Sequence, residues 1–290
     1  MTTNNIRSTP YPDAATLNDC SRQHRTVWQN RTMVWREWGE GSPIILLHGG
    51  FGSWTHWIRN IPALSAHHRV LVPDMLSFGE SDDLPDGHPI EMMTKALMNG
   101  VESLIQPIEK INIVGFSFGT LPASTLARAI REKHSVLQGQ LVLTAPAGLG
   151  LSVGRLSQLQ SIRTSESDSE TREIIRQNLN TMMIDDPSKI TEETIDLQIA
   201  NVARKRLTAK PVSRSELLIK TCNNLQLDNI NIIYGTKDVY KMRTEPAYSK
   251  ALVKVHPSLV IHEIEGAGHW AQYENPKAFN AIVQRCLSDA

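Results

Sequence analysis

The chain has 290 residues, 40% of them hydrophobic and 21% charged, and its formal net charge at pH 7 is zero. This length fits one large α/β domain or a core domain with an inserted subdomain, and the balanced charge does not favour binding to nucleic acid or to an anionic membrane. The three cysteines are odd in number and far apart, which matches neither a disulfide framework nor a zinc spacing. Without a signal-peptide pattern or an apolar run of membrane-spanning length, we expect a cytoplasmic protein with no membrane contact.

The predicted elements follow one another in the order of an α/β protein. Residues 1–20 are polar, and we expect a flexible leader there. Two short strands at 25–28 and 33–38 are predicted to meet in a turn at Asn30-Arg31. Apolar runs typical of buried parallel strands then alternate with helical patterns. These strands are expected at 43–47, 69–74, 111–114, 141–146, 229–234 and 259–264, and the helices near 54–64, 89–106, 121–130, 245–255 and 275–286.

The alternation stops between residues 151 and 210, where the pattern is polar and helical in period. We predict that 151–210 form a helical cap, inserted into a core domain made of 21–150 and 211–290. Such a cap can cover a site, exclude water and shape a pocket. Met182 and Met183 are candidates to line that pocket, although their helical spacing fits the core of the cap equally well.

The segment from Gly115 to Gly119 has the pattern Gly-x-Ser-x-Gly, with Ser117 at its centre. A buried strand is predicted before it and a helix after it, which is the context that a nucleophile elbow requires. Glycine is needed on either side of the serine because strand and helix backbones approach too closely for a Cβ atom. We therefore predict that Ser117 is a nucleophile held in a strained backbone conformation.

A glycine loop, His48-Gly49-Gly50-Phe51-Gly52, follows the predicted strand at 43–47. Loops at the carboxyl ends of parallel strands carry the ligand contacts of open α/β sheets. We predict that the backbone N–H groups of Gly50 and Phe118 form an oxyanion hole, and that His48 orders the loop. The alternative is an ordinary tight turn.

Two further residues complete a candidate triad in the chain order Ser117, Asp238, His269. Asp238 and His269 each follow a predicted strand, and the order nucleophile, acid, histidine is that of the α/β-hydrolase arrangement. The imidazole would remove the serine proton while the carboxylate fixes its tautomer. Among competing residues, Asp74 is interpreted as a loop-ordering residue, Asp228 precedes its strand, and His262 lies within a strand.

The whole chain resembles the α/β-hydrolase superfamily, on the strength of these motifs and of Gly79 with Ser81-Asp82. The resemblance implies an eight-stranded, mostly parallel sheet flanked by helices, with a helical cap and with neither cofactor nor metal. Parts of the chain are similar to the meta-cleavage product hydrolases, which split carbon–carbon bonds in ring-fission products. The matching segments are 268–274, 279–280 and 186–193.

Two positions depart from that narrower family. Its members usually have asparagine before the nucleophile, where this chain has Phe116, and a cap arginine that binds the substrate carboxylate, where this chain has Gln198. Without a guanidinium, an anionic dienoate loses a bidentate partner, so we expect a more apolar and less anionic acyl substrate. Thr120 stands where many relatives have glycine, with no evident chemical consequence.

We therefore predict a serine hydrolase that cleaves a small, largely apolar carboxylic ester or related acyl substrate through an acyl-enzyme. Phe51, Phe118 and Trp270 are expected to line an apolar pocket beneath the cap. The alternatives are a carbon–carbon hydrolase of vinylogous diketones that uses the same triad, or a triad-bearing lyase or ligand receptor on the same fold. Dehalogenase and epoxide-hydrolase chemistry is disfavoured because position 117 is serine, not a carboxylate. The sequence predicts a small-molecule partner and leaves a homodimer open.

Overall fold

The computed structural model describes residues 11–106, 110–134, 139–152, 159–162, 165–207, 210–225, 227 and 230–288. Its central feature is a sheet of eight strands in the order β1-β2-β4-β3-β5-β6-β7-β8. β1 pairs antiparallel with β2 and β2 antiparallel with β4, and all other neighbours are parallel. This confirms the predicted fold class. The strands are β1 Arg22–Trp28, β2 Arg31–Trp38, β3 Pro43–Leu47, β4 Arg69–Asp74, β5 Asn112–Phe116, β6 Leu141–Thr144, β7 Ile230–Gly235 and β8 Leu259–Ile264.

The first two strands form a hairpin whose turn lies one residue earlier than predicted. Gln29 and Asn30 both have positive φ, 47° and 59°, which is typical of the two-residue turns that match the twist of a hairpin. The preceding segment also differs from the predicted flexible leader, because α1 Ala14–Asp19 is a helix capped by Asp13. Leu17 in this helix is buried, and its carbonyl accepts the indole N–H of Trp38 at 2.9 Å. Residues 1–10 lie outside the described part of the chain.

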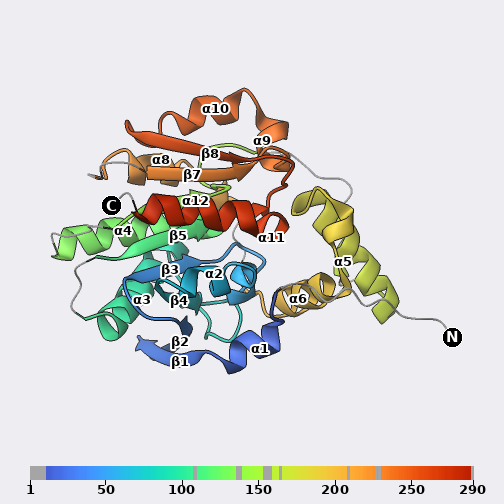
Figure 1. Cartoon of the computed structure of the whole chain (residues 1–290), viewed down its shortest axis with the longest axis horizontal. Coiled ribbons are helices and arrows are strands. Elements are labelled where there is room, and N and C mark those ends of the chain that lie inside the picture. Colours follow the sequence, from blue (N-terminus) through green and yellow to red (C-terminus); the bar gives the residue numbers. More distant parts are fainter. Residues whose placement is uncertain are drawn as a thin grey trace.

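Alternate residues of the central strands belong to two hydrophobic clusters, one on each face of the sheet. Ile45 and Ile113 belong to the first cluster, with residues of α3 Pro89–Leu104, α4 Thr120–His134, α8 Leu217–Cys222 and α10 Ala247–Leu252. Ile44 and Val114 belong to the second, with residues of α2 Ile61–Ser65 and α12 Pro276–Ser288. In Figure 1, α2 and α12 cross the near face of the sheet. Burial on both faces explains why these strands are continuous apolar runs.

Two predicted helices differ in the structure, one because it is divided and one because an additional helix precedes it. The pattern near 54–64 folds as a short 3₁₀ helix, η1 Trp54–Trp57, followed by α2. The pattern near 245–255 is α10, preceded by the separate helix α9 Val239–Thr244. The remaining short elements beside the sheet are η2 Ser117–Gly119 and α11 Ala271–Glu274.

The segment predicted as a cap contains helices and no described strand. Its helices are α5 Asp168–Met182, η4 Pro187–Lys189 and α6 Glu192–Ala203, and α7 Lys210–Ser213 begins at its end. Ser167 caps α5, and Thr191 and Thr194 form a capping box at the start of α6. Figure 1 shows α5 and α6 beyond one end of the sheet. The division at residues 151 and 210 stays a prediction. No helix of the described residues is long and apolar enough to cross a membrane.

Candidate active site

Ser117 stands at the turn between β5 and the helical segment that begins with η2. Its φ is +51°, a left-handed conformation that a non-glycine residue rarely adopts. A Cβ atom at Gly119 would lie 2.5 Å from the carbonyl oxygens of Leu47 and His48, and one at Gly115 would lie 2.7 Å from the Gly119 carbonyl oxygen. The local crowding therefore explains both glycines of the Gly-x-Ser-x-Gly pattern.

The structure brings the three predicted triad residues together. His269 Nε2 lies 3.0 Å from Ser117 Oγ, and His269 Nδ1 lies 2.8 Å from Asp238 Oδ2. Both partners of this second contact are buried, with 5% of His269 and 1% of Asp238 exposed. If the Nδ1–H donates to the carboxylate, Nε2 is left to accept the serine proton. The geometry is that of an activated serine nucleophile.

Each of these side chains follows the carboxyl end of a parallel strand, β5, β7 or β8. Asp238 also caps α9, where its Oδ1 accepts the Tyr240 N–H at 2.8 Å, and this leaves Oδ2 for His269. The loop that carries His269 is fixed by the buried carboxylate of Glu274, which accepts the Gly268 N–H at 2.7 Å. Glu274 also accepts the N–H groups of Asp185 and Asp186, so one side chain joins the His269 loop to the segment after α5.

The two predicted oxyanion donors lie on loops next to the nucleophile. The Phe118 N–H is in the first turn of a helical segment, where backbone N–H groups have no intrahelical acceptor. Gly119 lies against the carbonyl of His48, which places the glycine loop beside the elbow. Among the described residues the Gly50 N–H has no hydrogen-bond acceptor. Their role as an oxyanion hole stays a prediction.

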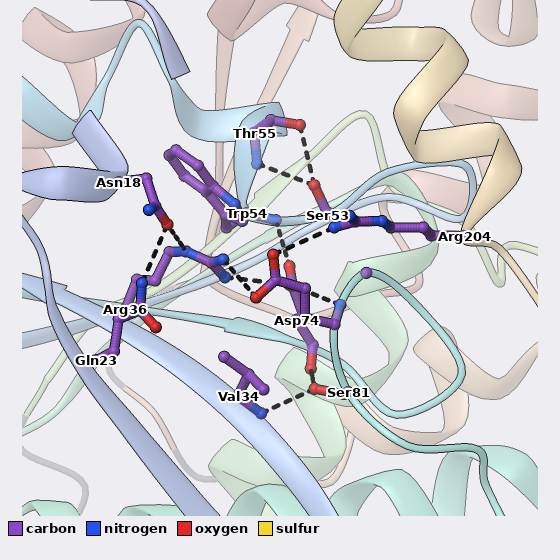
Figure 2. Close-up of polar contacts among 12 residues, drawn as sticks. Asn18, Gln23, Val34, Arg36, Ser53, Trp54, Thr55, Asp74, Ser81 and Arg204 are labelled. Atoms are coloured by element: carbon purple, nitrogen blue, oxygen red, sulfur yellow. Dashed lines mark hydrogen bonds and ion pairs between the residues drawn. The ribbon is translucent and has the colours of Figure 1, made fainter. Parts of the chain in front are cut away.

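Asp74 is the centre of a buried polar network that joins β2, η1 and the loop after β4 (Figure 2). Its Oδ1 accepts the Trp54 N–H at 2.9 Å, and its Oδ2 accepts the Glu80 N–H at 3.1 Å and Arg36 Nη1 at 3.2 Å. A Cβ atom at Gly79, whose φ is +49°, would collide with this carboxylate. Every bond of the Asp74 carboxylate orders a loop or a strand, as predicted for this residue.

The predicted substrate-binding residues have different environments. Phe51 is 42% exposed, and the Lys205 ammonium lies 4.7 Å from the centre of its ring. Met182 and Met183 are half-buried at the end of α5, and their place in a pocket stays a prediction. Trp270 has no accessible surface: its indole N–H donates to the His56 carbonyl at 3.0 Å, and its ring stacks on Tyr273. It packs inside the protein, so the expectation that it lines an open pocket is not met in this structure.

Three residues beside the triad were not identified from the sequence. The Tyr240 ring lies 4.5 Å from the His269 ring, centre to centre. The Thr120 hydroxyl donates to the Ser117 carbonyl at 2.6 Å and accepts the Ala147 N–H at 3.2 Å, so this departure from glycine ties the elbow to the loop after β6. His56 contacts the glycine loop. No motif marks Tyr240 or His56, because their contacts with His269 and Trp270 join segments far apart in the chain.

The remaining predictions from the sequence concern His262, Asp228 and metal binding. His262, within β8, has its Nε2 3.0 Å from Asn231 Oδ1 on the neighbouring strand, away from the triad. Asp228 lies outside the described residues. Across the described ranges, no group of three or more His, Cys, Asp and Glu side chains could hold a metal ion.

Comparison with known proteins adds independent observations. A family model described as the alpha/beta hydrolase family matches residues 44–282. A 2-hydroxy-6-oxo-6-phenylhexa-2,4-dienoate hydrolase from Burkholderia cepacia is 29% identical over 268 residues, covering 87% of this chain and 89% of the relative. A 2-hydroxy-6-oxononadienedioate/2-hydroxy-6-oxononatrienedioate hydrolase from Comamonas testosteroni matches to the same extent. The structure of a meta-cleavage product hydrolase from Pseudomonas fluorescens IP01 aligns with a TM-score of 0.72 over 92% of this chain and 97% of that one, at 23% identity, a likeness of fold alone.

Proposed function

Because the chain belongs to the α/β hydrolase family, we propose that it is a serine hydrolase that cleaves a carbon–carbon bond in a vinylogous diketone of the ring-fission type. The observation that carries the proposal is the hydrogen-bonded chain from Ser117 through His269 to Asp238. The similarity over 87% of the chain to a hydrolase of a phenylhexadienoate and to a hydrolase of a nonadienedioate and a nonatrienedioate supports the choice of substrate class.

In the proposed reaction, Ser117 Oγ attacks the ketone carbon while His269 Nε2 takes its proton. The charge on the carbonyl oxygen is met by the N–H groups of Gly50 and Phe118. Collapse of this intermediate breaks the adjacent carbon–carbon bond, and the electron pair is delocalised into the conjugated second carbonyl before the proton returns from His269. Water then hydrolyses the acyl-Ser117 ester, with His269 as the base. The products are a carboxylic acid and the shortened dienol.

A second candidate is hydrolysis of a carboxylic ester by the same steps, with an alkoxide as the leaving group. The observation that favours it is Gln198, which stands in α6 where the similar C–C hydrolases are expected to have arginine. Its side chain is 7% exposed, and its Nε2 donates to the Phe51 carbonyl at 3.3 Å. A neutral amide next to the glycine loop suits a substrate without a carboxylate better than an anionic dienoate.

One experiment tests both candidates. Wild type, Ser117→Ala and the control Ser103→Ala, which changes an exposed serine on α3, are assayed with p-nitrophenyl butyrate and with 2-hydroxy-6-oxo-6-phenylhexa-2,4-dienoate. We expect wild type to turn over the dienoate. Turnover should fall by about 10³-fold or more in Ser117→Ala, because the triad acts as a unit, and should be unchanged in Ser103→Ala. Turnover of the ester alone would select the second candidate. Near-wild-type turnover in Ser117→Ala would overturn the serine mechanism.

A further inference from the structure

His56 is a buried histidine that contacts three of the four segments that form the candidate site: the glycine loop, the nucleophile elbow and the His269 loop. It lies in η1 and is 1% exposed. The residues that it contacts are direct neighbours of candidate catalytic groups. Gly49 precedes the oxyanion donor Gly50, Phe116 precedes the nucleophile, and Trp270 follows the candidate base.

Two hydrogen bonds of His56 join the glycine loop to the His269 loop. Its Nδ1 accepts the Gly49 N–H at 3.0 Å, and its backbone carbonyl accepts the Trp270 indole N–H at 3.0 Å. The imidazole also packs against the rings of Phe116 and Trp270, at 5.3 and 4.9 Å between centres. A Cβ atom at Gly52 would collide with the imidazole, so the glycine loop closes directly around this ring.

The orientation of the Gly50 N–H follows from how Gly49 is held. His56 holds the N–H of Gly49, and His48 Nδ1 lies 2.9 Å from the carbonyl oxygen of the same residue. That carbonyl and the Gly50 N–H belong to one peptide group, and in a trans peptide they point in opposite directions. The Gly49 carbonyl also accepts the Gly52 N–H at 3.2 Å. With both sides of Gly49 fixed, the Gly50 N–H is turned away from His48 and is left without an acceptor among the described residues.

The protonation state of His56 suits this function. Burial, with smaller effects of the neighbouring His48 and His269, holds the pKa of His56 well below its ordinary value. The ring is therefore neutral, and because Nδ1 accepts a backbone N–H, its proton resides on Nε2. A protonated ring would have no acceptor to offer Gly49.

We propose that His56 is a positioning residue that orients the Gly50 N–H for an oxyanion by fixing the Gly49 peptide against the nucleophile elbow and the His269 loop. The proposal rests on the proposed function, because the direction of the Gly50 N–H matters to the reaction only if an oxyanion forms there. His56 touches no reacting atom, and it acts through Gly49.

Two variants separate the hydrogen bond from the packing. His56→Asn keeps an acceptor near the position of Nδ1 but loses most of the ring. His56→Phe keeps a ring of similar size but has no acceptor. If His56 acted only by filling space, His56→Phe would be the better enzyme. If its acceptor orients the glycine loop, His56→Asn is the better enzyme, although it leaves a cavity and melts at a lower temperature.

The variants are assayed with the substrate that wild type turns over in a Ser117-dependent manner. We expect His56→Phe to lower kcat by about 10²–10³-fold with KM changed by less than about threefold, because an oxyanion donor acts in the transition state. His56→Asn should stay within about tenfold of the wild-type kcat. Equal kcat values for wild type and His56→Phe, or a lower kcat for His56→Asn than for His56→Phe, would overturn the proposal.

A second readout does not depend on turnover. The amide hydrogen of Gly49, followed by NMR, should exchange with solvent faster in His56→Phe than in His56→Asn. Inhibition by 1,1,1-trifluoro-4-phenylbutan-2-one, which forms an oxyanion with an active serine, should weaken about 10²-fold in His56→Phe, while binding of the unfluorinated ketone stays unchanged. Equal exchange in both variants would refute the positioning role. Full activity of Ser117→Ala would instead refute the proposed function, so the two failures are distinguishable.

Discussion

Gln198 combines burial with unmet hydrogen-bonding capacity. Its Nε2 donates to the Phe51 carbonyl, but its Oε1 is buried and has no partner within the described part of the chain. A buried acceptor without a partner costs about 1–3 kcal/mol, so a group that satisfies it is favoured there. Because Phe51 directly follows Gly50, this amide contacts the loop that carries the predicted oxyanion donor.

Replacing Gln198 by arginine should change the affinity for substrates that carry a carboxylate. Gln198→Arg should lower KM about tenfold or more for a carboxylate-bearing dienoate, because a charge-assisted hydrogen bond contributes about 1.5–3 kcal/mol. Its KM for the neutral p-nitrophenyl butyrate should change little. Gln198→Met, which has a similar length and no charge, is the matched control. Steady-state kinetics with both substrates measure the ratio, and an unchanged ratio would mean that Gln198 does not face the substrate.

The helix α6 is attached to the core by a buried contact and by an exposed one, which differ in strength. Asn201 Oδ1 accepts the buried hydroxyls of Ser53 at 2.7 Å and Thr55 at 3.1 Å. Three residues further on, Arg204 pairs with Glu80 at 3.2 Å, with 57% and 39% of their side chains exposed. Figure 2 shows Ser53, Thr55 and Arg204 beside the Asp74 network. α6 is thus attached to the segment 53–55, in which Asp74 accepts the Trp54 N–H.

The two attachments should respond differently to truncation. Asn201→Ala removes the shared acceptor of two buried hydroxyls that lie 3.0 Å apart, so at least one of them is left without an acceptor. We expect it to lower the free energy of unfolding by about 1–3 kcal/mol and to speed amide exchange in α6. Arg204→Ala removes an exposed ion pair and should cost less than about 1 kcal/mol. Urea denaturation and hydrogen exchange of both variants provide the comparison. A larger loss in Arg204→Ala would show that surface charge holds α6 on the core.

For the whole molecule, buried histidines couple stability to pH. Burial lowers the pKa of His48, and it lowers that of His56 further. Both imidazoles are neutral in the folded state, whereas in the unfolded chain they gain a proton as the pH falls through their ordinary value of about 6.5. The unfolded state then binds more protons than the folded state, so the stability is complete above about pH 6.5 and is lost as the pH falls below it.

The free energy of unfolding should depend less on pH in His56→Asn than in wild type, because asparagine cannot gain this proton. Between pH 7.5 and pH 5.5, the free energy of unfolding of wild type should fall by about 1.4 kcal/mol more than that of the variant. Contributions of carboxylates common to both proteins cancel in this difference. Urea unfolding at the two pH values measures it. Identical pH dependence would mean that His56 is protonated in the folded protein.

Local patterns in the sequence were sufficient for the fold class and for the candidate triad. Runs such as 43–47 are apolar throughout because both faces of the strand are buried, and that is visible in the sequence alone. The chemistry of Ser117, Asp238 and His269 was predictable for a related reason. In a parallel sheet the carboxyl ends of the strands share one edge, so residues that follow different strands are brought together by the fold itself.

The contacts that hold the glycine loop and the His269 loop in place were visible only in the tertiary structure. His56 bonds to Gly49 and to Trp270, which is 214 residues away, and Glu274 joins the His269 loop to the segment after α5. The indole of Trp270 is buried and the ring of Phe51 is exposed, although both were expected to line a pocket. Side-chain direction in loops depends on which distant surfaces meet there, and no local period encodes it. The sequence thus determined the strands and the reactive residues at their ends, whereas only packing between distant segments decided what holds those residues in place.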